Sequence, residues 1–180
     1  VREDSGVYLC IKNLGIEATH VLDPTLLLTS DDYNELCKHI NKHKPFVFAY
    51  ILDMDECKVA EIKSFAVKKG LPYFIKSAGS DIQDSDSVEL WLSYFRDASF
   101  IITDSFHGTA FSINYNKNFI VYGNEERGNN RFESMLKLFK LKHRYVDSVN
   151  VDIPPINWDE VNLLLQGERM KSWEWLSKIL

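Results

Sequence analysis

The segment Asp104–Gly108 holds the densest group of side chains that could do chemistry. It reads Asp-Ser-Phe-His-Gly and stands between the buried apolar run Phe100–Thr103 and a short helix expected near Thr109–Asn114. His107 would therefore lie at the N-terminus of that helix, where unpaired backbone N–H groups and the helix dipole favour anions. Asp104 is a candidate base, or a group that orients His107. The segment therefore predicts an anion site with proton-transfer chemistry.

The same order of residues argues against two common kinds of active site. Asp104, Ser105 and His107 are too close in sequence to line up as a nucleophile, a base and an orienting group, and no nucleophile-elbow motif is present. The histidines and cysteines do not have the spacing of zinc ligands, so no metal is expected. A structural histidine that caps a helix is the alternative interpretation of His107. Gly108 would let a ligand or a neighbouring segment approach the backbone closely.

Two arginines could hold a bound anion. Arg131 stands at the start of a helix predicted over Arg131–Phe139, and Arg2 lies near the beginning of the chain. Each can grip a carboxylate or a phosphate through the planar guanidinium fork. We interpret Arg127 and Arg144 instead as solvated surface charges.

Apolar spacing predicts the helices that must position these residues. Apolar residues recur at i, i+3, i+4 and i+7 in several separate stretches. The predicted helical segments are Val7–Leu14, Tyr33–Ile40, Val59–Ala66, Val88–Phe95, Phe132–Phe139 and a C-terminal region over residues 157–180. Ser5 and Gly15 are expected to bound the first helix, and Asp86 and Glu89 have the spacing of a capping box.

Short apolar runs between the helices predict a parallel sheet. They are Ala18–Leu22, Phe46–Leu52, Tyr73–Ile75, Phe100–Thr103, Phe119–Tyr122 and, more weakly, Arg144–Val146. The runs are continuous, as in strands buried on both faces, so we expect one Rossmann-like α/β domain over residues 1–180 with helices on both faces. Ligands bind beyond the carboxyl ends of such strands. Asp23, Asp53 and Asp104 each follow a run directly, although for Asp53 the favoured interpretation is the N-cap of the next helix.

The composition excludes several classes of protein. The 180 residues carry a net charge of −5, which argues against a broad nucleic-acid or anionic-membrane surface. No apolar run reaches the ~18–20 residues of a membrane span. Cys10, Cys37 and Cys57 form no CxxC unit, so we expect small buried side chains in a reducing compartment such as the cytoplasm.

Four stretches of the chain resemble the C-terminal half of the polysaccharide pyruvyl transferase family. They are Val1-Arg2-Glu3, the Asp-Pro motif in Leu22–Leu27, the His-Gly segment in Ala98–Ser112, and Gly128–Phe132 followed by Met135-Leu136. The resemblance covers most of residues 1–146. It departs at Ser105, because many members carry Arg-x-His-Gly where this chain has Ser-Phe-His-Gly, a version that is also familiar from bacterial members.

The resemblance implies an activity and a set of site residues. Members transfer a pyruvyl group from phosphoenolpyruvate onto a sugar of a cell-surface polysaccharide, such as capsule or exopolysaccharide, or onto its lipid-linked precursor. The product is a ketal, and phosphate is released. His107 and Asp104 would be catalytic, and no cofactor is implied beyond the donor substrate. The implied substrate-binding residues are Arg2, Asp23, Ser105, Gly108 and Arg131.

The resemblance also implies a GT-B-like enzyme with its site between two Rossmann-like domains. This chain would be the C-terminal domain, its partner an N-terminal domain of the same protein, and its location the cytoplasm or the inner face of the membrane. Alone it would fold but be inactive, because an open site does not exclude water. Two alternatives stay open: a GT-B glycosyltransferase domain that binds a nucleotide sugar, and a non-enzymatic flavodoxin-like or receiver-like module with Asp53 at a strand end.

Overall fold

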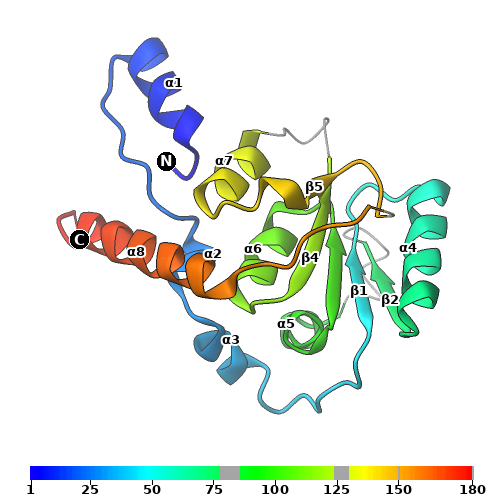
Figure 1. Ribbon diagram of the computed structural model, residues 1–180. Helices are drawn as coiled ribbons and strands as arrows, with labels where there is room; N and C mark the ends of the chain where they lie inside the picture. The colour runs from blue at the N-terminus through cyan, green and yellow to red at the C-terminus, as the bar shows by residue number, and fades with distance from the viewer. Residues whose placement is uncertain (78–85, 124–129, 150, 180) are drawn as a thin grey trace.

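Five parallel strands form the central sheet of the computed structural model, which describes residues 1–77, 86–123, 130–149 and 151–179 (Figure 1). The order in the sheet is β2-β1-β3-β4-β5, so the chain reverses its direction of winding between β1 and β3. The strands are β1 (Val47–Tyr50), β2 (Tyr73–Lys76), β3 (Phe100–Thr103), β4 (Asn118–Tyr122) and β5 (Tyr145–Val146). The predicted Rossmann-like α/β fold is confirmed.

Helices surround this sheet (Figure 1). They are α1 (Asp4–Leu14), α2 (Pro24–Leu27), α3 (Ser30–Leu36), α4 (Glu56–Lys69), α5 (Val88–Asp97), α6 (Phe106–Asn114), α7 (Asn130–Leu138) and α8 (Trp158–Leu176). A 3₁₀ turn over Lys142–Arg144 precedes β5. The predicted C-terminal helical region is one helix that continues through Gly167.

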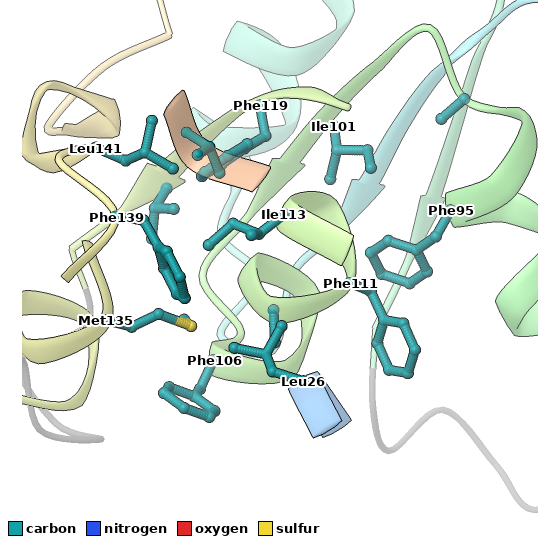
Figure 2. Close-up of a cluster of buried hydrophobic side chains, with 14 of the residues drawn as sticks. Leu26, Phe95, Ile101, Phe106, Phe111, Ile113, Phe119, Met135, Phe139 and Leu141 are labelled. Atoms are coloured by element: carbon teal, nitrogen blue, oxygen red, sulfur yellow. The ribbon is translucent and has the colours of Figure 1, made fainter. Parts of the chain in front are cut away.

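The two faces of the sheet bury separate apolar clusters. Phe48 and Phe119 belong to a large cluster with side chains of α2, α5, α6, α7 and α8, part of which Figure 2 shows. Ile102 and Ile120 point to the other face, where they share a smaller cluster with Ile62 and other residues of α4. Because successive strand residues face opposite sides and both sides are buried, the strands read as continuous apolar runs.

Helix α6 is buried along almost its whole length. Every residue of Phe106–Asn114 is buried except His107, which is exposed. Figure 2 shows Phe106, Phe111 and Ile113 of this helix inside the large cluster. The packing of its apolar side chains therefore fixes α6 firmly and leaves one polar side chain facing solvent.

Hydrogen bonds from Arg169 of helix α8 connect α2 to α6. The Arg169 guanidinium donates hydrogen bonds of 2.7 Å to the carbonyls of both Leu26 and Leu28, and one of 3.0 Å to the Asn114 side chain. Asn114 donates in turn to the Leu28 carbonyl at 3.1 Å. These bonds pair backbone carbonyls at the end of the short helix α2 and so hold α2 in place.

The expectation of a strand over Ala18–Leu22 is wrong. The backbone N–H of Val21 donates to the Val1 carbonyl at 2.9 Å, and that of Leu22 donates to the Ser172 hydroxyl at 2.9 Å. These donors are satisfied outside the sheet, so the run is an irregular connection between α1 and α2. Asp23 at its end is consequently the N-cap of α2 and does not follow a strand.

Two predicted helix caps are also wrong, and α3 ends at Leu36, before the expected Ile40. Ser5 lies inside α1, because Glu3 occupies the N-cap position. Ser87 caps α5 through a hydrogen bond from the Leu90 backbone, so Asp86 and Glu89 do not form the expected capping box. Gly15 and Gly70 end α1 and α4 in the left-handed conformation, as predicted for C-terminal glycines.

The structure corrects the expectations for one arginine and two cysteines. Arg144 is 2% exposed and donates to the carbonyls of Phe119 and Pro154, so it joins β4 to the chain ahead of α8 instead of facing solvent. Burial lowers the pKa of its guanidinium. Among the cysteines only Cys37 is buried, because Cys10 is half-buried and Cys57 is exposed near the start of α4. Arg127 lies outside the described residues.

Candidate functional site

His107 lies in the first turn of α6, directly beyond the carboxyl end of β3. Ser105 is the N-cap, and its hydroxyl accepts a 3.2 Å hydrogen bond from the Gly108 backbone. The helix begins at Phe106, earlier than the start expected near Thr109, and this places His107 within its positively polarised end. The predicted position at the carboxyl edge of the sheet is confirmed. The catalytic role of His107 stays a prediction.

Only glycine fits at position 108, because α6 lies very close to the end of β3 there. A Cβ atom added there would lie 2.3 Å from the Thr103 Oγ1 atom. That hydroxyl cannot easily move, because it donates to the Tyr50 carbonyl at 2.7 Å and accepts from the Ser105 backbone at 3.0 Å. The neighbouring segment that the sequence predicted is therefore Thr103, and contact of Gly108 with substrate stays a prediction.

The ring of Phe106 brings two predicted anion-binding arginines together. The guanidinium carbon of Arg2 lies 5.1 Å from the centroid of this ring, and that of Arg131 lies 5.8 Å from it. Both distances are within the range of cation–π attraction. Figure 2 shows Phe106 in the buried cluster with Met135 of α7. A buried aromatic side chain thus serves as a common support for two cations from distant parts of the chain.

Asp23 completes this group from the N-terminus of α2. Its carboxylate accepts from the Arg2 guanidinium at 2.9 Å and from the Thr25 backbone at 3.0 Å. Burial alone would raise the pKa of Asp23. The hydrogen bonds from Thr25 and Arg2, together with the positive field of His107, outweigh burial and hold the pKa below its ordinary value.

Asp104 lies in a different environment from the one expected of a base. It is 1% exposed, and its two oxygens accept from the Leu52 backbone at 2.6 Å and the Asp53 backbone at 3.1 Å. The Lys58 ammonium stands 3.4 Å away. This carboxylate ties the loop after β1 to the end of β3, at the point where the winding of the sheet reverses. The geometry favours a positioning role over proton transfer from a substrate hydroxyl.

The residues around Asp104 change one expectation for the loop after β1. Asp55, and not Asp53, caps α4, since its side chain accepts from the Lys58 backbone at 2.7 Å. The Asp53 carbonyl accepts a 2.7 Å hydrogen bond from the Lys58 ammonium. Sequence inspection overlooked Lys58 because an i+3 lysine after an N-cap is usually solvated.

The site that results consists of two guanidiniums, one carboxylate and one imidazole at the start of a buried helix. We name Arg2, Asp23, Phe106, His107 and Arg131 the anion cluster. A guanidinium binds a carboxylate or a phosphate through paired hydrogen bonds, so two of them suit an anion with more than one charged group. Sequence reasoning found its four polar members and missed Phe106. The available signal was an aromatic residue directly before a histidine at a helix start.

The described part of the chain lacks two further features. Within residues 1–77, 86–123, 130–149 and 151–179, no group of three or more histidine, cysteine or acidic side chains is placed to hold a metal ion. None of the helices in these ranges is both long and apolar enough to cross a membrane.

The comparison with known families agrees with the motifs of the anion cluster. The family model described as polysaccharide pyruvyl transferase matches residues 1–126. Arg2, Asp23, Phe106 and His107 lie within this match, and Arg131 lies beyond it. No curated protein and no solved structure matches the chain. Because the family model covers well over half of the sequence, the chain belongs to the polysaccharide pyruvyl transferase family.

Proposed function

We propose that the anion cluster binds phosphoenolpyruvate and that the protein transfers its pyruvyl group onto two hydroxyls of a saccharide. The observation that carries this proposal is the meeting of Arg2 and Arg131 over one phenylalanine ring, beside His107. Phosphoenolpyruvate has a carboxylate and a phosphate attached to the same carbon atom, and two guanidiniums near one helix N-terminus match that pair of anions.

The backbone at the start of α6 supports the same assignment. Ser105 takes the N–H of Gly108, while the N–H groups of Phe106 and His107 precede the first hydrogen bond within the helix. These two donors and the helix dipole would add to the guanidiniums around a phosphate. We assign no separate cofactor, because the donor itself brings the reactive group.

The reaction needs one proton delivered to carbon and two removed from hydroxyls. A proton adds to the methylene carbon of phosphoenolpyruvate, and the oxocarbenium-like centre accepts the first hydroxyl oxygen. The second hydroxyl oxygen then replaces phosphate, which closes the ketal. Of the two hydroxyl protons, one balances the proton used at carbon and the other leaves with phosphate. His107 is exposed at this site and can serve as the acid or bind the leaving phosphate. One positioned acid or base typically raises the reaction rate ~10²–10⁴-fold.

We further propose that a second domain of the same protein covers the anion cluster, as in GT-B-like enzymes. The exposure of His107 and of Arg2, whose side chain is 39% exposed, supports this. Covering this face would exclude water and strengthen the electrostatic contacts to the donor. The donor is a cytoplasmic metabolite, so we place the reaction in the cytoplasm, or at the inner membrane face for a lipid-linked acceptor.

The deciding experiment is a binding comparison of phosphoenolpyruvate, inorganic phosphate, UDP-glucose and GDP-mannose by isothermal titration calorimetry. Phosphoenolpyruvate should bind more tightly than phosphate, and an Arg131→Lys variant should lose this preference. Tighter binding of either nucleotide sugar would favour the glycosyltransferase alternative and contradict the proposal. Phosphate release from phosphoenolpyruvate, dependent on added saccharide and measured with the full-length enzyme, would test the transfer step.

A further inference from the structure

A second cleft opens at the carboxyl edge of the sheet, between the start of α4 and the ends of β4 and β5. Its volume is about 440 Å³, within the usual range for small-molecule sites. Its lining includes the side chains of Asp55, Cys57, Lys58, Glu61, Tyr122, Tyr145 and Asp147. We name it the Glu61 cleft. None of these residues belongs to the anion cluster.

Glu61 is held in a fixed orientation at the wall of this cleft. Its Oε2 atom accepts hydrogen bonds from the Tyr122 hydroxyl at 2.8 Å, the Ser148 hydroxyl at 3.1 Å and the Val149 backbone at 3.2 Å. Burial and the neighbouring Glu61 carboxylate raise the pKa of Tyr122, which keeps that phenol a hydrogen-bond donor. Among the described residues, every hydrogen bond to this carboxylate falls on Oε2, so Oε1 remains for a ligand.

Lys58 supplies the one ammonium among the described residues that line the cleft, and it is already neutralised. Lys58 donates to the Asp53 carbonyl at 2.7 Å, stands 3.4 Å from Asp104 and 3.8 Å from Asp55, and is 19% exposed. Among the described lining residues, the carboxylates of Glu61 and Asp147 therefore meet no free positive charge. A second anion would be repelled, whereas hydroxyl groups could donate to these oxygens.

The Glu61 cleft and the anion cluster lie on the same edge of the sheet. Lys58 at the cleft contacts Asp104, and Asp104 directly precedes Ser105, the N-cap of the helix that carries His107. A ligand in the cleft would thus lie near the end of β3, where the anion cluster begins.

We propose that the Glu61 cleft binds an uncharged part of the saccharide acceptor and selects against acidic sugars. The identification of this sugar as the acceptor rests on the proposed function. The binding of a sugar and its charge preference rest on the cleft alone. Glu61 accepts hydrogen bonds from sugar hydroxyls through Oε1, and Tyr145 offers an aromatic side chain. The carboxylates of Glu61 and Asp147 repel the carboxylate of a uronic acid.

Cys57 provides a direct reporter of occupancy, because it is exposed and lines the cleft. We would measure its alkylation by iodoacetamide with peptide mass spectrometry, using Cys10 outside the cleft as the internal control. Methyl β-D-galactopyranoside and methyl β-D-glucopyranoside should slow the alkylation of Cys57 roughly twofold when their concentration equals the Kd. Methyl β-D-glucuronide and phosphoenolpyruvate should leave it unchanged.

Two variants separate the role of charge from that of the fold. Asp147→Asn removes an exposed carboxylate that makes no described hydrogen bond, and it should allow the glucuronide to protect Cys57. Glu61→Gln should weaken protection by the neutral glycosides. Its thermal unfolding must be measured in parallel, since Glu61 also anchors Ser148 and Val149. Asp159→Asn on α8 makes the same chemical change away from the cleft and should change neither result.

Three outcomes would overturn the inference. They are equal protection by neutral and acidic glycosides, equal protection of Cys10 and Cys57, and no protection up to roughly 100 mM glycoside, the range of weak single-sugar binding. Phosphoenolpyruvate binding on the same sample identifies which proposal has failed. Donor binding without glycoside protection rejects the Glu61 cleft alone, and glycoside protection without donor binding rejects the proposed donor.

Discussion

Arg2 donates a 2.9 Å hydrogen bond to the carboxylate of Asp23, and this pair connects the start of the chain to the N-terminus of α2. Asp23 is 4% exposed and Arg2 is 39% exposed, so the ion pair has one buried end and one end at the surface. Asp23 therefore holds the guanidinium near Phe106 before any ligand arrives. A side chain that is already ordered loses less entropy when it binds an anion.

Replacing His107 should affect catalysis and not folding. In the full-length enzyme we expect His107→Ala to lower kcat by at least ~100-fold, the usual effect of losing one proton-transfer group. The unfolding midpoint should stay the same, because the side chain is exposed. His39→Ala, another exposed histidine, should leave kcat unchanged. Near-normal turnover in His107→Ala would assign this residue a structural role.

Arg131→Lys should weaken the donor more than the acceptor. Lysine keeps the charge but cannot make a bidentate contact, so we expect the Kd of phosphoenolpyruvate to rise roughly tenfold. The KM for the saccharide should change little, as steady-state kinetics with each substrate varied in turn would show. Lys142→Arg, in the neighbouring 3₁₀ turn, provides the reverse exchange as a control. An equal effect on both substrates would contradict the assignment.

Phe106→Leu tests whether the ring supports both arginines. Loss of two cation–π contacts, each about 0.5–1 kcal/mol, should raise the Kd of phosphoenolpyruvate roughly tenfold. The smaller side chain should also lower the free energy of unfolding by about 1 kcal/mol. Phe111→Leu is the matched control in the same helix, with a similarly buried ring. Phe111→Leu should lower the free energy of unfolding by a similar amount and leave phosphoenolpyruvate binding unchanged. Equal Kd values for the two variants would refute the role of the Phe106 ring.

Asp104→Asn should destabilise the fold rather than remove a base. The amide cannot accept from both Leu52 and Asp53, and Lys58 loses its buried counter-ion. We expect a loss of about 2–4 kcal/mol in chemical denaturation. In the double variant Lys58→Met/Asp104→Asn, the loss of unfolding free energy should be smaller than the sum of the losses in the two single variants, because Lys58 and Asp104 interact with each other. A stable, inactive single variant would instead support the base that the sequence suggested.

Asp23 should give the protein a defined loss of stability in acid. The pKa of Asp23 is lower in the folded than in the unfolded chain. Its contribution to the free energy of unfolding is therefore complete above the unfolded pKa of about 3.9, and it disappears as the pH falls through the folded pKa. The difference in unfolding free energy between wild type and Asp23→Asn should be constant from about pH 7 to 5 and shrink below about pH 4. Asp152→Asn, an exposed carboxylate without a described hydrogen bond, controls for net charge. A difference that grows in acid would reverse the sign and reject this account.

Local sequence determined the elements and the position of His107. Continuous apolar runs such as Phe100–Thr103 identify strands that are buried on both faces, and they do so without reference to any partner. A polar Asp-Ser pair after such a run, followed by a helical pattern, places His107 at a helix N-terminus. Gly15 and Gly70 end their helices for an equally local reason, because glycine adopts the left-handed conformation readily.

Tertiary structure alone decided which of these residues meet. Arg2 and Arg131 lie far apart in the sequence. The ion pair with Asp23 holds Arg2 near the ring of Phe106, and the packing of α6 and α7 in one core brings Arg131 to the same ring. Likewise, no local pattern reveals that the carboxylate of Asp104 pairs with the loop after β1. Apolar periodicity shows that a segment must be buried but does not specify its partner, which depends on long-range packing and hydrogen bonding. For the same reason Ala18–Leu22 resembles a strand in sequence and lies outside the sheet in the fold.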